Sequence, residues 1–270
     1  MKYRLAAADL DGTLLDANSE LTEETVKAVK AAQDAGLIFT ISTGRAQNSI
    51  MGFISKLGIN CPVITYNGAM LIKPDGEIIY RCDLESDDAV DAYNMGADLG
   101  VDMVVWSDNR VYFSRMTSAI ERYRSMYPKA ECFVIGDRSE IYDIVKNGIS
   151  KIIFVDTPEN TERNQRLIQE RFGGRIAYFR SSSFYLELVN KSVSKGAALM
   201  KLAEHYGIPR EQTAAFGDQK NDMPMIEAAG LGVAMENAVD ELKSIADYIT
   251  LPNTENGVAA VLYKMIEDSI

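Results

Sequence analysis

The sequence predicts an α/β protein in which a parallel-sheet core is interrupted by an inserted α+β module. Three observations lead to this prediction. The first eighty residues alternate short β-rich runs with amphipathic helical runs. From about Cys82 the pattern changes to a helix followed by closely spaced β-runs, and the first pattern returns at Ser194. We therefore expect a core domain formed by residues 1–82 and 190–270, and an inserted domain formed by residues 83–189.

The first core segment is expected to contain two βα units in order. A buried strand over residues 3–10 is followed by a helix that Thr22 caps, that carries glutamates in its first turn and that Gly36 ends. Further elements then follow: a strand at 37–42, a helix at 50–57 and a strand at 62–66. This alternation is typical of a parallel sheet covered by helices.

The inserted segment has a different pattern. A helix near 86–99 precedes two β-runs, 103–107 and 111–115, which the turn Asp108-Asn109-Arg110 joins into a hairpin. Hairpins belong to antiparallel sheets. The other expected elements of this segment are helices near 117–126 and 159–172 and β-runs at 149–155, 175–180 and 184–189.

From Ser194 the parallel pattern resumes and continues through the closing segment. The expected order is a helix at 194–206, a strand at 213–216, a helix at 223–229, a strand at 231–234, a helix from Ala238, a strand at 248–251 and a closing helix. Both core segments are therefore predicted to contribute to one domain.

Composition and charge restrict the classes of function. Of 270 residues, 47% are hydrophobic and 25% are charged, as in an ordinary globular protein. A net charge of −11 disfavours non-specific binding to nucleic acid or to an anionic membrane. The three cysteines are too few and too scattered for a disulfide framework, and we find neither a secretory signal nor an apolar run of about 20 residues. We expect a soluble, cytoplasmic protein.

Two aspartates, Asp9 and Asp11, stand at the carboxyl end of the first predicted strand, where open α/β sheets place their ligands. Other polar segments end at the same edge of the predicted sheet. They are Ser42-Thr43-Gly44-Arg45 after the second strand, Ser194-Lys195-Gly196 at a helix start, and Gly217-Asp218-Gln219-Lys220-Asn221-Asp222. Although these segments are far apart in sequence, we expect the topology to bring them together.

These residue types suit phosphoryl transfer, which needs a nucleophile, a proton donor and cations for the phosphoryl oxygens. Asp9 would attack phosphorus and form an aspartyl phosphate, and Asp11 would protonate the leaving oxygen and then activate water. Thr43 would donate a hydrogen bond to the phosphoryl oxygens. Lys195, at a helix N-terminus, would neutralise the charge that develops there.

The same edge of the sheet predicts a magnesium site. Asp9 and Asp218, with carbonyl and water oxygens, supply the hard ligands that Mg²⁺ prefers. Asn221 and Asp222 would complete or orient that ligand shell. For Asp222 the alternative is that its charge favours the start of the following helix, and both roles are compatible. The metal would also screen an anionic substrate from the acidic side chains.

Together, these segments resemble the motifs of the haloacid dehalogenase superfamily of phosphatases, and the insertion resembles that of its Cof-type branch. The matching residues are Asp9-Leu10-Asp11-Gly12-Thr13-Leu14, Thr43, Lys195, and Gly217-Asp218 with Asn221-Asp222, so the resemblance spans the whole chain. It implies a Rossmannoid core and a mobile α+β cap. It also implies that Mg²⁺ is held by Asp9, by the backbone carbonyl of Asp11 and by Asp218.

Two further stretches, Thr43-Gly44-Arg45 and Asn67-Gly68-Ala69, are similar to stretches typical of this branch. The resemblance implies substrate binding by Thr43, Gly44, Arg45, Asn67 and Lys195. From the residues alone, Arg45 and Asn67 could equally contact substrate or only support the loop.

The leading hypothesis is a magnesium-dependent phosphatase that hydrolyses small phosphorylated metabolites, such as sugar phosphates or phosphorylated cofactors, with the cap closing over the leaving group. The alternatives are a phosphomutase acting on sugar phosphates and a non-catalytic regulator that binds a phosphorylated metabolite on the same scaffold. We expect no nucleic-acid or membrane partner, and a monomer or a weak homo-oligomer.

Overall fold

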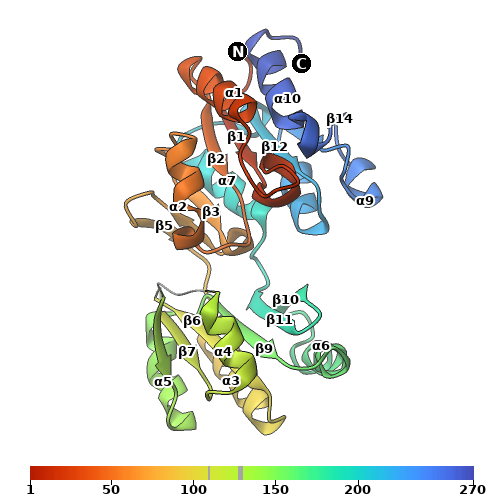
Figure 1. The fold of residues 1–270 in the computed structure, drawn as a ribbon. Helices are drawn as coiled ribbons and strands as arrows, with labels where there is room; N and C mark the ends of the chain where they lie inside the picture. Colours follow the sequence, from red (N-terminus) through yellow and green to blue (C-terminus); the bar gives the residue numbers. More distant parts are fainter. Residues whose placement is uncertain (109, 127–129) are drawn as a thin grey trace. The chain divides into compact units, whose positions relative to one another are not determined.

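A computed structural model describes residues 1–108, 110–126 and 130–270. The chain divides into two compact units, drawn in Figure 1. Unit 1 comprises Met1–Arg81 and Ser194–Ile270, and unit 2 comprises Cys82–Val193. The chain thus leaves unit 1 once and returns to it once.

A five-stranded parallel sheet forms the centre of unit 1, which confirms the predicted α/β core. Its order is β14 (Tyr248–Ile249), β13 (Leu231–Ala234), β12 (Thr213–Gly217), β1 (Leu5–Ala8) and β2 (Ile38–Ile41). All four residues of β1 are completely buried, as expected for a central strand covered on both faces. Strands from both core segments of the sequence therefore pair directly.

Helices cover this sheet, with bounds close to those expected: α1 (Glu23–Asp34), α2 (Gln47–Lys56), α7 (Lys195–His205), α8 (Met223–Ala228), α9 (Asp240–Lys243) and α10 (Gly257–Ile266). Thr22 caps α1 as predicted, because its hydroxyl accepts a hydrogen bond from the Thr25 amide at 3.1 Å. Helix α1 packs against α10, so the first and last helices lie side by side (Figure 1).

The third predicted strand forms, but in a different sheet. Strand β3 (Val63–Thr65) pairs antiparallel with β4 (Met70–Ile72), which pairs with β5 (Ile78–Arg81). An isolated parallel bridge between Ser42 and Ile64 joins β3 to the end of β2. The hairpin was not predicted. The chain reverses at residues 66–68, where Tyr66, Asn67 and Gly68 all have positive φ angles. Asn and Gly favour this conformation, whereas a tyrosine rarely adopts it.

Unit 2 is built on a six-stranded sheet. Its order is β10 (Ile176–Ser182), β11 (Tyr185–Asn190), β9 (Lys151–Val155), β6 (Asp102–Ser107), β7 (Arg110–Phe113) and β8 (Glu131–Val134). All neighbours pair antiparallel except β7 and β8, which are parallel. The predicted hairpin is confirmed as β6 and β7, whereas Asn109 of its turn lies outside the described residues.

Helices α3 (Ser86–Asp98), α5 (Ile141–Ile144) and α6 (Pro158–Phe172) share a hydrophobic core with this sheet, and α4 (Ser118–Ser125) contacts β6. The short elements β8 and α5 were not predicted. Strand β8 has no buried residue, so it lacks the apolar run by which a strand is found in sequence. The α+β character expected of the insertion is present.

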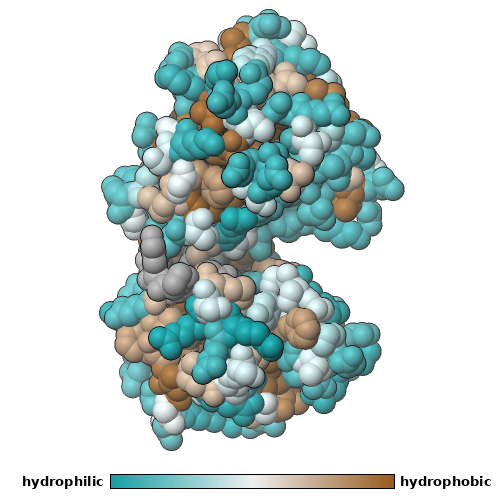
Figure 2. All heavy atoms as spheres, in the orientation of Figure 1, coloured by the Kyte–Doolittle hydropathy of each residue, from teal (hydrophilic) through white to brown (hydrophobic). Residues whose placement is uncertain are grey.

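The face drawn in Figure 2 is mostly hydrophilic on both units, with hydrophobic residues interspersed. Among the described residues, no helix combines the length and the apolar character needed to cross a lipid bilayer.

Candidate active site

Asp9 lies directly after β1, at the carboxyl end of the parallel sheet. Its backbone amide donates to the carbonyl of Phe216 in β12 at 2.9 Å. A π-helical turn, Leu10–Leu14, follows at once. This backbone bond brings the start of the chain next to Asp218, which follows β12.

Lys195 lies in the first turn of α7 and is completely buried. Its Nζ atom donates to Asp9 Oδ1 at 2.6 Å and to Asp222 Oδ1 at 2.5 Å. Ser194 caps the helix through a bond from the Ala197 amide at 3.0 Å. This cap approaches Gly68 so closely that a Cβ there would lie 2.1 Å from the Ser194 carbonyl oxygen.

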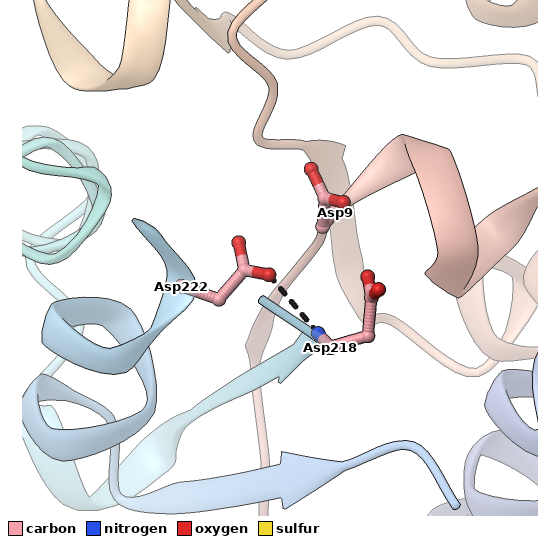
Figure 3. A group of neighbouring side chains, drawn as sticks. All are labelled: Asp9, Asp218 and Asp222. Atoms are coloured by element: carbon pink, nitrogen blue, oxygen red, sulfur yellow. Dashed lines mark hydrogen bonds between the residues drawn. The ribbon is translucent and has the colours of Figure 1, made fainter. Parts of the chain in front are cut away.

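Asp222 uses both carboxylate oxygens within the protein. Oδ1 accepts from Lys195, and Oδ2 accepts from the backbone amides of Asp218 at 3.0 Å and Gln219 at 2.9 Å. Figure 3 shows its carboxylate directed at the Asp218 amide. Asp222 also ends the short 3₁₀ turn Lys220–Asp222 that leads into α8. Asp222 therefore both lies at the start of a helix and makes polar contacts within the site.

Asp218 is held by neutral donors. Thr13 Oγ1 donates to Oδ1 at 2.9 Å, and Gln219 Nε2 donates to Oδ2 at 2.9 Å. Carboxylate oxygens of Asp9, Asp218 and Asp222 lie within 4.8 Å of one another (Figure 3). This buried cluster of hard oxygen atoms has the ligand chemistry of a divalent-cation site.

Thr43 follows β2 and is 1% exposed. Its amide donates to the Ile64 carbonyl at 2.9 Å, and its carbonyl accepts from the Asn67 amide at 3.0 Å. The Asn67 side chain accepts in turn from Asn221 Nδ2 at 3.1 Å. The structure therefore brings Asn221 to Asn67. A Cβ on Gly44 would lie 3.1 Å from the side-chain amide of Asn67.

Arg45 makes a contact that the sequence did not reveal. Its guanidinium donates to both carboxylate oxygens of Asp11, from Nε at 2.9 Å and from Nη2 at 2.5 Å. The side chains of Arg45 and Asp11 are 35% and 51% exposed, so the pair lies at the solvent-accessible rim of the cluster.

Burial and charge perturb the acidic groups. Burial raises the pKa of Asp9 to about 7, although the nearby Lys195 ammonium opposes the rise. Burial also raises the pKa of Asp218, against the hydrogen bonds from Gln219 and Thr13. For Lys195, burial acts to lower the pKa, but Asp9 and Asp222 raise it, so the lysine stays charged. The site thus combines a charged lysine with two carboxyl groups, Asp9 and Asp218, whose ionisation burial disfavours.

Four residues near the cluster were missed in the sequence. Thr13 and Gln219 bond Asp218, and Asn237 and Asn253 donate to the carbonyls of Gly12 and Leu15. Thr13 and Gln219 lie within the polar segments that contain Asp9 and Asp218, so their positions could have indicated a role at the site. Asn237 and Asn253 offered none, because single asparagines in loops are common turn residues.

Comparison with known proteins adds independent findings. A family model described as haloacid dehalogenase-like hydrolase matches residues 6–262. Phosphatase YwpJ of Bacillus subtilis is 31% identical, over 97% of this chain and 100% of that protein. The 5-amino-6-(5-phospho-D-ribitylamino)uracil phosphatase YwtE of the same organism is 30% identical, over 96% and 97%. The crystal structure of TM0651 from Thermotoga maritima is similar with a TM-score of 0.85 and 31% identity, covering 97% of each chain.

Proposed function

Because this chain belongs to the haloacid dehalogenase-like hydrolase family and is a phosphatase, we propose that it hydrolyses small phosphorylated metabolites with Mg²⁺ through an aspartyl phosphate on Asp9. The observation that carries this proposal is the buried Lys195, which bonds Asp9 and Asp222 at the edge of a cluster of three carboxylates. A buried cation beside a carboxylate nucleophile suits an anionic phosphoryl group.

In this proposal Asp9 attacks phosphorus, and the bond from phosphorus to the leaving oxygen breaks. Asp11 gives a proton to that oxygen and then takes one from the water that hydrolyses the aspartyl phosphate. Thr43 and Lys195 stabilise the phosphoryl oxygens. Asp11 can act only after its pair with Arg45 opens, and an arriving phosphate ester offers the guanidinium an equivalent bidentate acceptor.

We assign the metal to Asp9 and Asp218, together with the backbone carbonyl of Asp11. The fit rests on the donor set, because buried carboxylate oxygens of Asp9 and Asp218 lie within 4.8 Å of each other. When bound, Mg²⁺ would polarise a phosphoryl oxygen and offset the negative charge of the site. Asp222 would orient this site instead of binding the ion, because one of its oxygens accepts from the Lys195 ammonium and the other from two backbone amides. Each Asp218 oxygen, in contrast, accepts from a single neutral side chain. Asn221 would support the loop of Asn67.

Unit 2 is proposed to be the cap that selects the leaving group, since the phosphoryl-binding residues all belong to unit 1. Sugar phosphates and phosphorylated cofactors are the proposed substrates. One relative is named for a phosphorylated ribitylamino-pyrimidine, so that class belongs in any panel of candidate compounds.

The test is turnover of a phosphorylated-metabolite panel and an aryl phosphate with Mg²⁺ and with EDTA. We expect phosphate release that EDTA abolishes and that Asp9→Asn lowers by at least about a thousandfold. Asp16→Asn is the matched control, because Asp16 lies in its own turn at residues 16–20 and should retain full activity. Retained activity in Asp9→Asn would refute the mechanism. Isomerised sugar phosphate with little free phosphate would indicate a phosphomutase, and binding without turnover would indicate a regulator.

A further inference from the structure

The π-helical turn after Asp9 is an irregular piece of backbone. Asp11 (φ −83°, ψ 118°) and Gly12 (φ 81°, ψ −1°) depart from helical torsion angles within it. Because such a turn lacks a regular ladder, partners from elsewhere in the chain help to decide where its carbonyls point. The position of this turn matters, since it carries Asp11 and begins at Asp9.

Two asparagines from the C-terminal part of unit 1 supply those partners. Asn237 Nδ2 donates to the Gly12 carbonyl at 2.8 Å, and Asn253 Nδ2 donates to the Leu15 carbonyl at 2.7 Å. The backbone amide of Asn253 also donates to Asn237 Oδ1 at 2.9 Å. Asn253 thus fixes the orientation of the Asn237 side-chain amide, because its backbone N–H donates to the Asn237 oxygen. The NH₂ group of Asn237 donates to the Gly12 carbonyl.

The segment that carries Asn237 also holds the loop of Asp218. The Met235 amide donates to the Gly217 carbonyl at 3.1 Å, and the Val239 amide donates to the Asp218 carbonyl at 3.0 Å. Asn237 stands between these two anchor points in sequence. One short segment, residues 235–239, therefore connects the turn after Asp9 to the loop that carries Asp218.

Gly12 is a sensitive point for such a connection. A Cβ at this position would lie 2.5 Å from Asp218 Oδ2, so the turn and the carboxylate are in close contact. The next residue, Thr13, bonds the same carboxylate at 2.9 Å. A shift of the Gly12 peptide would consequently alter how Asp11 and Asp218 are placed relative to each other.

We propose that Asn237 is a positioning residue for the reaction at Asp9, acting through the Gly12 carbonyl, and that Asn253 orients Asn237 for this purpose. The inference rests on the proposed function. It predicts a loss in kcat with little change in KM, because Thr43 and Lys195, the groups proposed to bind the phosphoryl oxygens, come from other elements. Since small misplacements of reacting groups slow enzymes strongly, we expect kcat to fall by about tenfold or more.

The decisive variant is Asn237→Asp. It keeps the oxygen that accepts from Asn253 and removes the N–H that donates to Gly12. Asn237→Ala removes both bonds, and Asn253→Ala removes only the bond to Leu15. Glu236→Gln is the matched control, because Glu236 is an exposed neighbour whose carboxylate pairs with Lys243 at 3.4 Å instead of with the turn. We expect wild-type kcat in Glu236→Gln and a lowered kcat in both Asn237 variants.

Hydrogen exchange supplies a readout that does not depend on turnover. The amides of Leu14 and Leu15 donate to the carbonyls of Asp9 and Leu10 at 3.3 and 3.0 Å inside the turn. In Asn237→Asp these amides should exchange about tenfold faster, while the amides of β1 and β12 stay protected and Glu236→Gln matches the wild type. Unchanged exchange in Asn237→Asp, or a kcat equal to wild type, would overturn the inference. An unmodified protein that lacks turnover counts against the proposed function, and the exchange result still decides the positioning role.

Discussion

Replacing Asp222 by Asn perturbs a carboxylate that we propose does not react. The variant keeps the shape of the side chain but removes its charge. In the structure, one oxygen faces the Lys195 ammonium and the other faces two backbone amides, so all of its neighbours are donors. The new NH₂ group must therefore point at a donor whichever way the amide is turned.

The cost follows from the burial of this contact. Both Asp222 and Lys195 are 0% exposed, and their bond is 2.5 Å long. A buried charge-assisted hydrogen bond contributes about 1.5–3 kcal/mol, and breaking a buried ion pair costs about 3–5 kcal/mol. Lys195 keeps Asp9 as a partner, so we expect a loss of about 2–4 kcal/mol, which corresponds to a fall in Tm of roughly 5–10 °C.

Thermal unfolding followed by circular dichroism at neutral pH without metal measures this loss. Glu241→Gln is the control, since it removes a carboxylate from an exposed ion pair. Glu241 lies in α9 and pairs at 2.6 Å with Lys220, which belongs to the same loop as Asp222. The Tm of Glu241→Gln should equal that of the wild type. If the Tm values of Asp222→Asn and Glu241→Gln differ by less than about 1 °C, the claim that Asp222 holds Lys195 in place is refuted.

Three further predictions concern the same site. Gly68→Ala should destabilise the protein by about 2–4 kcal/mol more than Gly36→Ala. Both glycines have φ near +100°, but of the two only Gly68 would clash on gaining a Cβ, with the Ser194 carbonyl. Equal losses of the free energy of unfolding in chemical denaturation would contradict this. Lys195→Met should abolish turnover and should destabilise the protein more at pH 8 than at pH 5, because it leaves buried carboxylates unpaired when they ionise; a Tm loss independent of pH would argue against it. In the metal-free protein, burial raises the pKa of Asp9 from 3.8 to about 7. Protonated Asp9 therefore contributes stability that is fully present below pH 3.8 and is lost as the pH rises through 7. Mg²⁺ must displace that proton, so the rise in Tm caused by Mg²⁺ should weaken as the pH falls below about 7, and a rise that is the same at pH 5 and pH 8 would disprove the link.

Much of unit 1 could be predicted because its signals are local. Thr22 caps α1 through a residue three positions away, and β1, β2 and β12 are short apolar runs between helical patterns. The rule that parallel strands share a carboxyl edge was sufficient to expect Asp9 and Asp218 side by side, and the structure confirms their proximity. The antiparallel strands β4 and β5 were missed because they are only three and four residues long, at the lower limit of the runs by which a strand is found in sequence.

The sequence by itself thus determined the fold class, the order of most elements and the set of polar segments at the edge of the sheet. Only the tertiary structure decided which side chains meet: Arg45 with Asp11, Asn221 with Asn67, and Asn237 with Gly12. The physical reason is the range of the interactions. Helix caps and hydrophobic periods are set within a few residues, whereas each of these contacts joins segments that only the packing of helices on the sheet brings together.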